Sequence, residues 1–199
     1  GIELWQAVDE APEAPADAIA NAWFRARRFI GATDRRVVSD RLWAMLRAAP
    51  RLAWHLKRAR APITPRTLML AQLAVAEGAA VDAVAGLFNA ARHGPSPLAD
   101  AERRALAGLA DRVLDDPAMP EAARLGVPDW LLPRLAARFG ATLAAEMAAF
   151  DAPAPSDLRA NLLKATREEA RAALAAEGIA TVPTPFSPWG LRAEGRPPV

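Results

Sequence analysis

The amino-acid sequence predicts a mainly α-helical protein, with about nine helices in residues 1–150 and a truncated β-α-β (α+β) subdomain in residues 157–199. Apolar side chains recur at spacings of three and four through the first part, as they do on the buried face of a helix. A proline-rich linker at residues 151–156 separates the two parts. The 199 residues can bury one main core with a smaller appendage.

Three helices are predicted in the first third of the chain. The first is a short opening helix around Leu4, and the second begins at Asp17 as its N-cap and ends at Gly31. The predicted apolar stripe of the second helix consists of Ile19, Ala22, Trp23, Ala26, Phe29 and Ile30. The third helix is predicted to begin near Thr33 and to end at Pro50, because proline lacks the amide hydrogen that a helix interior requires. Its predicted buried side chains are Val38, Leu42, Met45 and Leu46.

Later helices are marked by their end signals. Thr64-Pro65 predicts the start of a helix that ends at Gly78, and Ser96-Pro97 predicts the opening of a long Ala-Leu helix. Asp129 is predicted to cap another helix. Further helices are predicted over residues 81–91 and 141–150, and the helix after Asp129 carries Trp130, Leu131, Leu132 and Leu135.

The pattern changes after the linker. Residues 158–163 and 179–186 are short and apolar, as strands are, and Thr166-Arg-Glu-Glu169 is a capping box that predicts a helix ending at Gly178. Prolines and glycines interrupt the remaining tail, so no further strand is predicted. A two-stranded sheet with one helix is marginal alone, which predicts an incomplete subdomain.

Several function classes are excluded by composition. The chain has no cysteine, which excludes disulfides, thiolate metal sites and cysteine nucleophiles. His55 and His93 have no second ligand at helical spacing, so they are interpreted as structural or surface residues and no metal site is predicted. No apolar run reaches the roughly 18 residues of a spanning helix, and the first 20 residues lack a signal-peptide pattern, so a cytoplasmic location is expected.

Charge is unevenly distributed along the chain. The net charge is +2, yet residues 1–20 carry five acids and no base, whereas residues 21–66 carry twelve bases and two acids. Segregation of this kind costs self-repulsion, and it favours a polyanionic partner whose phosphates neutralise the bases. An arginine-rich genome would explain why the chain has 23 Arg and two Lys, but not why they are segregated. Contact with RNA or DNA is therefore favoured.

Three motifs resemble, in order, the N-terminal portion of the ribosomal RNA small-subunit methyltransferase B family, also called Fmu or Sun. The first is Phe24-Arg-Ala-Arg-Arg-Phe-Ile-Gly-Ala-Thr-Asp-Arg-Arg36 followed by Leu42-Trp-Ala-Met-Leu-Arg47. The second is Pro128-Asp-Trp-Leu-Leu-Pro-Arg-Leu135, and the third is Leu158-Arg-Ala-Asn-Leu-Leu-Lys164 with the capping box that follows. Ala160 and Leu162 replace the family's usual valine and threonine, and Asp151 replaces a frequent asparagine.

The resemblance implies a leading helical domain with the fold of the antitermination factor NusB, over residues 1–150. It also implies a full-length parent that uses S-adenosylmethionine to methylate carbon 5 of cytosine in ribosomal RNA, through cysteines in a later domain. This chain has neither a cysteine nor a nucleotide-binding glycine cluster after a strand, so we expect no catalytic residue and no cofactor in it. The expected role is docking of small-subunit ribosomal RNA by a monomer.

The candidate RNA-binding residues come from the basic segment and from the third motif. They are Arg25, Arg27, Arg28, Arg35, Arg36, Arg41, Arg47, Arg159, Asn161 and Lys164. For the last three, orienting the linker is an equally good interpretation. Trp23, Trp43, Trp54 and Trp130 either stack on bases or pack in the core, and core packing is favoured.

Two other functions remain open. NusB-like domains also bind ribosomal proteins, so the chain is alternatively a protein-interaction module of the transcription-antitermination type. The second is an independent regulator whose tail completes its sheet by dimerisation.

Overall fold

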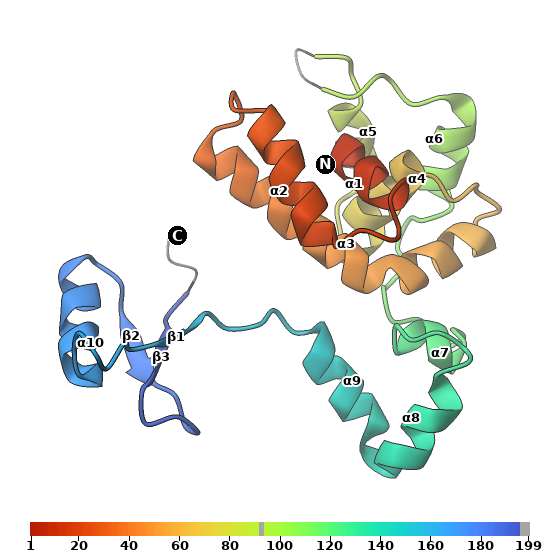
Figure 1. Ribbon diagram of the computed structural model, residues 1–199. Coiled ribbons are helices and arrows are strands. Elements are labelled where there is room, and N and C mark those ends of the chain that lie inside the picture. The colour runs from red at the N-terminus through yellow and green to blue at the C-terminus, as the bar shows by residue number, and fades with distance from the viewer. Residues whose placement is uncertain (92–93, 196–199) are drawn as a thin grey trace. The chain divides into compact units, whose positions relative to one another are not determined.

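The computed structural model describes residues 1–91 and 94–195. It is mainly helical, with a small antiparallel sheet near the C-terminus (Figure 1). The chain divides into two compact units, Gly1–Ala148 and Ala149–Val199. The predicted fold class, mainly helical with a small β-containing part, is confirmed. His93 and the tail prolines Pro197 and Pro198 lie outside the described residues.

Nine α-helices precede the sheet in the described part of the chain, as the sequence predicts. They and two irregular turns are α1 (Ile2–Asp9), α2 (Ala16–Ala26), α3 (Ala32–Arg58), α4 (Pro65–Ala71), the π-helical η1 (Gln72–Ala76), α5 (Val81–Leu87), α6 (Asp100–Ala107), α7 (Glu121–Arg124), α8 (Leu132–Phe139), the 3-10 turn η2 (Gly140–Thr142) and α9 (Leu143–Asp151). None of the described helices is both long and apolar enough to cross a membrane.

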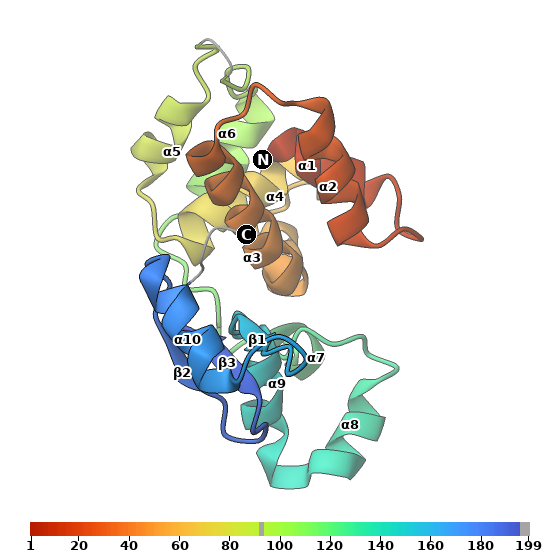
Figure 2. The ribbon, with the colours of Figure 1, turned by 60° about the vertical axis from the view of Figure 1, so that its left-hand side comes forward.

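The long helix α3 organises the core of the first unit. It packs against α4, η1 and α7, and α1 packs against both α2 and α4. Figure 2 shows α1, α2 and α4 beside α3. The side chains of Leu52, Leu56 and Leu70 are completely buried, and each contributes about 2 kcal/mol of hydrophobic stabilisation. The core therefore lies where α3 meets α4.

The prediction that α3 ends at Pro50 is wrong. The helix continues through Pro50 to Arg58, although an internal proline costs about 3 kcal/mol. The turns beyond Pro50 carry Leu52, His55 and Leu56, all completely buried. Burial of this second half outweighs the cost of the missing backbone hydrogen bond.

The predicted stripe of α2 is also wrong in its second half. The helix ends at Ala26, and Phe29 lies in the following turn with 76% of its surface exposed. The buried side chains of α2 are Ala20 and Phe24. Trp23 and Ile30 of the predicted stripe are partly buried against the core, whereas Ala26 and Phe29 are exposed, because residues 27–31 form a turn and do not extend the helix.

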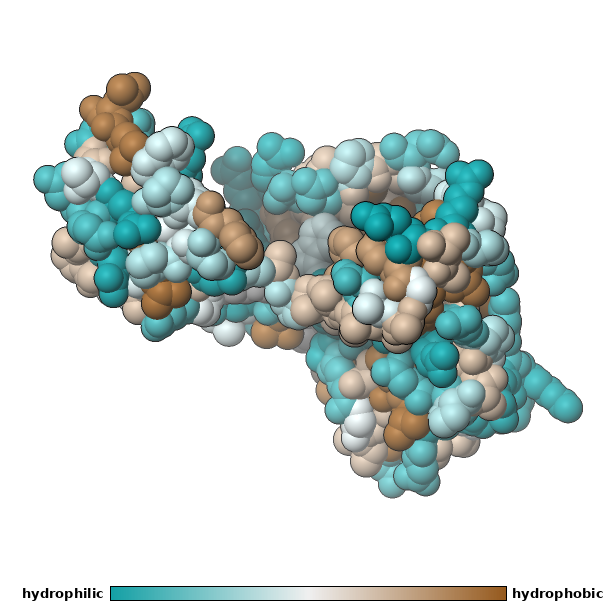
Figure 3. All heavy atoms as spheres, turned by 90° about the horizontal axis from the view of Figure 1, so that it is seen from below, coloured by the Kyte–Doolittle hydropathy of each residue, from teal (hydrophilic) through white to brown (hydrophobic). Residues whose placement is uncertain are grey.

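The other predicted helix ends are partly confirmed. Thr64 caps α4 in a capping box with Thr67, as the Thr64-Pro65 signal predicts. Asp129 does not cap a helix, because α8 begins only at Leu132, and the side chain of Trp130 is 69% exposed. The helices predicted from residues 81 and 97 are shorter than expected, and α7 was not predicted. Phe29, Leu163 and Phe186 are among the exposed hydrophobic side chains. Figure 3 shows brown hydrophobic groups among teal hydrophilic ones on one face of the molecule.

The second unit contains β1 (Asp157–Arg159), α10 (Arg167–Ala176), β2 (Thr181–Pro183) and β3 (Gly190–Ala193). The sheet order is β1-β3-β2, and both pairings are antiparallel. The capping box that opens α10 is confirmed, because the Thr166 hydroxyl accepts from the Glu169 amide and Glu169 accepts from the Thr166 amide.

The prediction that no strand follows β2 is wrong. β3 lies between β1 and β2, with Leu191 and Ala193 buried and Arg192 on the opposite face. Pro188 and Gly190 were interpreted as breakers of structure, but Pro188 precedes this strand and Gly190 is its first residue. Gly190 fits because a Cβ at this position would overlap the Thr184 side chain. The arrangement is therefore β-α-β-β, with a third strand between the two predicted ones.

Candidate nucleic-acid interface

Basic residues of the segment 21–66 lie at both ends of α3. Arg35 and Arg36 follow its first residues, whereas Lys57 and Arg58 lie in its last turn. At 1.5 Å per residue, Arg36 and Arg58 are separated by about 33 Å along the helix. The basic segment therefore forms two separate surfaces. We call Arg25, Arg28, Arg35 and Arg36 the N-terminal arginine cluster, and Lys57, Arg58 and Arg60 the C-terminal basic cluster.

The N-terminal arginine cluster joins the end of α2 to the beginning of α3. Its four side chains are exposed, and none of them forms an ion pair with any carboxylate in residues 1–91 or 94–195. The Arg35 guanidinium lies 5.3 Å from the centre of the Phe24 ring, which fixes the first turns of α3 against α2. The cluster presents fixed positive charge to solvent.

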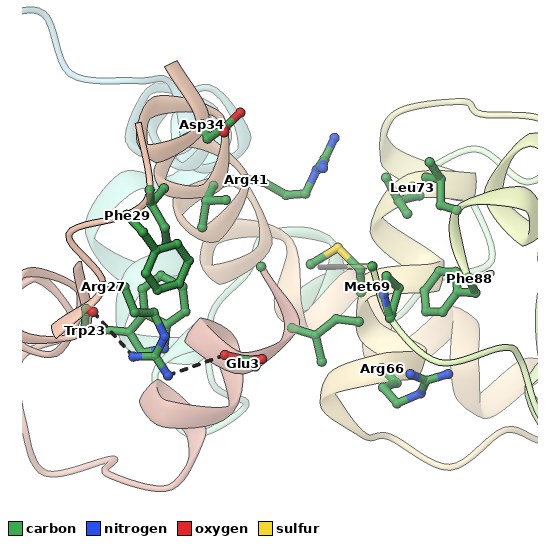
Figure 4. A pocket seen from close by; sticks show the side chains of 17 residues that line it. Glu3, Trp23, Arg27, Phe29, Asp34, Arg41, Arg66, Met69, Leu73 and Phe88 are labelled. Carbon is green, nitrogen blue, oxygen red and sulfur yellow. Dashed lines mark hydrogen bonds and ion pairs between the residues drawn. The ribbon is translucent and has the colours of Figure 1, made fainter. Parts of the chain in front are cut away.

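Arg27 and Arg41, also predicted to bind RNA, are instead held by carboxylates. Arg27 approaches Glu3 at 3.4 Å and lies 4.0 Å above the Trp23 ring (Figure 4). Arg41 donates from Nε and Nη2 to the two carboxylate oxygens of Glu77, at 2.8 and 2.7 Å. These acids come from outside the basic segment, so counting charge along the sequence overestimates the charge available to a ligand.

A cavity of about 680 Å³ lies beside these pairs. Figure 4 shows Arg27, Arg41 and Arg66 at its edge, with apolar side chains such as Met69 and Phe88 between them. Its lining comes from α1, α2, α3, α4 and later segments, so no contiguous sequence motif predicts it. Sequence reasoning therefore missed this cavity.

Arg66 stabilises one wall of the cavity. Its Nε and Nη2 donate to the two carboxylate oxygens of Glu102 at 2.6 and 3.0 Å. These hydrogen bonds hold the pKa of Glu102 below its ordinary value, despite the opposing effect of burial. Glu102 also accepts from the Ala99 amide at the start of α6, so the pair ties α4 to α6.

Two further arginines of α3 lie against the segment that follows α6. Arg51 is 9% exposed, and its Nη1 donates to Asp115 at 3.2 Å. Arg47, a predicted RNA contact, is half-buried, and its carbonyl accepts from Arg51 Nη2. Arg51 therefore has a structural role, and Arg47 is less accessible than the N-terminal arginine cluster.

Of the three candidate residues in the second unit, Arg159 is the last residue of β1, and Asn161 and Lys164 follow the strand. Arg159 and Lys164 are exposed, whereas the Asn161 side chain accepts from the Leu163 amide at 3.1 Å and so shapes the turn after β1. Next to them, Arg192 donates to both carboxylate oxygens of Asp157, at 2.7 and 2.8 Å. Those hydrogen bonds lower the pKa of Asp157. The structure gives Asn161 a local role and leaves the two cations open to solvent.

Residues 127–199 match the family model described as the RsmF/B-like methyltransferase, ferredoxin-like domain. The match supports membership of the RsmB/Fmu/Sun family. Two of the three motifs that resemble this family lie within the matched residues, and the match suggests a module of a ribosomal RNA methyltransferase family. The NusB-like interpretation concerns earlier residues, which the match does not cover. No curated protein matches the chain.

The resemblance to this family implies S-adenosylmethionine as the methyl donor, and the described residues do not fit it. In an RsmB-type catalytic domain a glycine-rich turn joins a strand to a helix, but here β1 is followed by Ala160-Asn-Leu-Leu-Lys164. Among the described residues, no group of His, Asp and Glu side chains has the arrangement of a metal site. We therefore derive no methyl-transfer step from this chain.

Proposed function

We propose that this chain is the RNA-docking part of an S-adenosylmethionine-dependent ribosomal RNA (cytosine-5) methyltransferase, and that it is not catalytic by itself. The expected partner is small-subunit ribosomal RNA. The chain contains no cysteine, so the nucleophile that adds to cytosine belongs to another part of the parent enzyme. The observation that carries the proposal is the N-terminal arginine cluster, whose guanidinium groups form no ion pair with a carboxylate within the described residues.

The physical basis is neutralisation by phosphate. Four exposed guanidinium groups near one helix start repel one another, and Arg35 and Arg36 also face the positive end of the α3 dipole. RNA phosphates remove this repulsion and release their counterions on binding. Guanidinium groups bind phosphate oxygens in a forked geometry, which orients RNA without specifying its sequence. The cluster is therefore suited to positioning a structured RNA.

The test is RNA binding by the triple variant R25A/R28A/R36A, which leaves the Arg35–Phe24 contact intact. We expect the affinity for a small-subunit ribosomal RNA fragment, measured by fluorescence anisotropy, to fall roughly 10-fold to 100-fold. The slope of log K against log salt should become shallower by about 2, because each phosphate contact contributes about 0.7–0.9.

The matched control is R103A/R104A/R134A, which removes the same charge from exposed positions on α6 and α8. This variant should bind RNA nearly as the unmodified chain does. Equal losses for the two variants would mean that net charge alone, and not the N-terminal arginine cluster, attracts the RNA. Absence of RNA binding by the unmodified chain at low salt would rule the proposal out.

A protein-interaction module is the second candidate function. The cavity of about 680 Å³ favours it, because the exposed side chains of Phe29 and Leu87 are part of its lining and offer an apolar surface to a partner. A pull-down of ribosomal proteins that survives nuclease treatment and is lost in L87K would support this alternative.

A further inference from the structure

A second hollow, of about 460 Å³, lies against the C-terminal half of α3. Its walls come from α3 and from residues 120–129, and they are mostly apolar. The lining residues are Pro50, Ala53, Trp54, Lys57, Pro120, Ala123, Gly126, Val127, Pro128 and Asp129. The basic segment thus contributes one indole ring and one ammonium group to the same hollow.

Trp54 is held in place from two sides. The Arg58 guanidinium lies 4.8 Å from its ring centre, and the His55 ring meets it edge-on at 4.9 Å. His55 is completely buried, and its Nε2 lies 3.1 Å from the Leu114 carbonyl oxygen. The indole is therefore a preorganised platform that still lines the hollow.

The charge around the hollow is positive. Lys57, Arg58 and Arg60 are exposed, and none of them forms an ion pair with a carboxylate among the described residues. Asp129 is the one acid in the lining. An apolar hollow with an aromatic wall and a cationic rim suits a ligand that joins a flat ring to a phosphate.

We infer that this hollow binds an unpaired nucleotide of RNA, with the base against Trp54 and the phosphate on Lys57 and Arg58. Base stacking on aromatic side chains is the usual way in which proteins bind single-stranded nucleic acid without reading sequence. The inference rests on the proposed function, since it assigns a second contact to the same RNA. The N-terminal arginine cluster holds phosphates about 33 Å away along α3, so the two surfaces contact different parts of that RNA.

The observations favour RNA over a peptide. Proline-rich peptides also bind between aromatic side chains, but their recognition needs no cationic rim. Here Lys57 lines the hollow and Arg58 lies over the Trp54 ring that forms part of its wall, and these two cations attract a polyanion. A protein partner is the alternative outcome of the test.

The experiment compares two RNA probes with the full chain: a single-stranded decamer of adenosine and a duplex hairpin without unpaired bases. W54A should weaken binding of the decamer roughly tenfold and leave binding of the hairpin unchanged. The salt slope for W54A should stay constant, because a lost stacking contact releases no counterion. W54F should retain most of the affinity, since a smaller aromatic ring still stacks.

Two controls separate this inference from a folding defect and from the proposed function. Thermal unfolding checks that W54A is folded; if it is not, K57A/R58A replaces it and should weaken the decamer more than the hairpin. R25A/R28A/R36A should weaken both probes. The inference is overturned if folded W54A, or K57A/R58A in its place, has the same ratio of decamer affinity to hairpin affinity as the unmodified chain. The proposed function still stands in that case, as long as R25A/R28A/R36A loses RNA affinity. Binding of an acidic proline-rich peptide that W54A abolishes, with RNA affinity unchanged, overturns it in favour of a protein partner.

Discussion

Single residues in this chain show how far a sequence motif can be trusted. Arg27 and Arg41 belong to the same basic segment as Arg28 and Arg36, yet carboxylates from α1 and the end of η1 hold the first two. The neighbouring residues in the sequence do not distinguish Arg27 and Arg41 from Arg28 and Arg36. The partners Glu3 and Glu77 are distant in sequence, so only packing reveals which guanidinium groups are available for RNA.

The Arg66–Glu102 pair makes a testable contribution to stability. Both side chains are less than a third exposed, so E102Q should lower the free energy of unfolding at pH 7 by about 1–2 kcal/mol. Urea unfolding measures this loss. E121Q, at an exposed position on α7, should change the free energy by less than about 0.5 kcal/mol.

The same pair has a defined pH dependence. The pKa of Glu102 is lower in the folded chain than its ordinary value of 4.5, so its contribution is fully present above pH 4.5. It is lost as the pH falls through the folded pKa, because the carboxylate must then take up a proton. The difference in stability between the unmodified chain and E102Q should therefore shrink below pH 4.5. A constant difference down to pH 2 would contradict this assignment.

At the scale of elements, α3 shows how burial overrides a local rule. Pro50 predicts a helix end, but the residues after it fill the core and the helix continues for two more turns. The capping box of α10 is the opposite case, because it is formed by residues three apart and was recognised from sequence alone. The Thr64-Pro65 signal likewise marks the start of α4, whereas the caps predicted at Asp17 and Asp129 do not form.

Replacement of Pro50 should raise stability. P50A restores an amide that can donate to the Leu46 carbonyl, and alanine favours the helix, so the free energy of unfolding should rise by about 1–2 kcal/mol. Part of the gain is offset because proline restricts the unfolded chain. Thermal unfolding is the measurement. P120A, where proline precedes α7, should instead be neutral or slightly destabilising. A destabilised P50A would show that α3 requires its proline.

At the scale of the whole molecule, the division into two units predicts separate responses to mutation. The first unit has the large core around α3, whereas the second buries Leu191 and Ala193 of β3 with Thr181 of β2. The family match extends from the second unit into α8 and α9 of the first, so the conserved sequence pattern and the compact units have different boundaries.

G190A tests whether the sheet unfolds independently. A Cβ at Gly190 would overlap the Thr184 side chain, so the β2–β3 hairpin should be destabilised by about 1–3 kcal/mol. Amide hydrogen exchange should accelerate in β2 and β3 and remain unchanged in α3. G86A, where a Cβ has free space, should be neutral or stabilising. Faster exchange in both units of G190A would mean that they unfold together.

The sequence by itself determined the helical class, the position of the change from helices to sheet, the family resemblance and the segment that carries the positive charge. Each of these depends on composition, periodicity or contiguous motifs, which are properties of neighbouring residues. Tertiary structure alone decided the third strand, the length of α3, the two hollows and the division of the basic segment into two clusters. These features arise where residues distant in sequence compete for the same buried space or pair opposite charges, and no local pattern records the outcome of that competition.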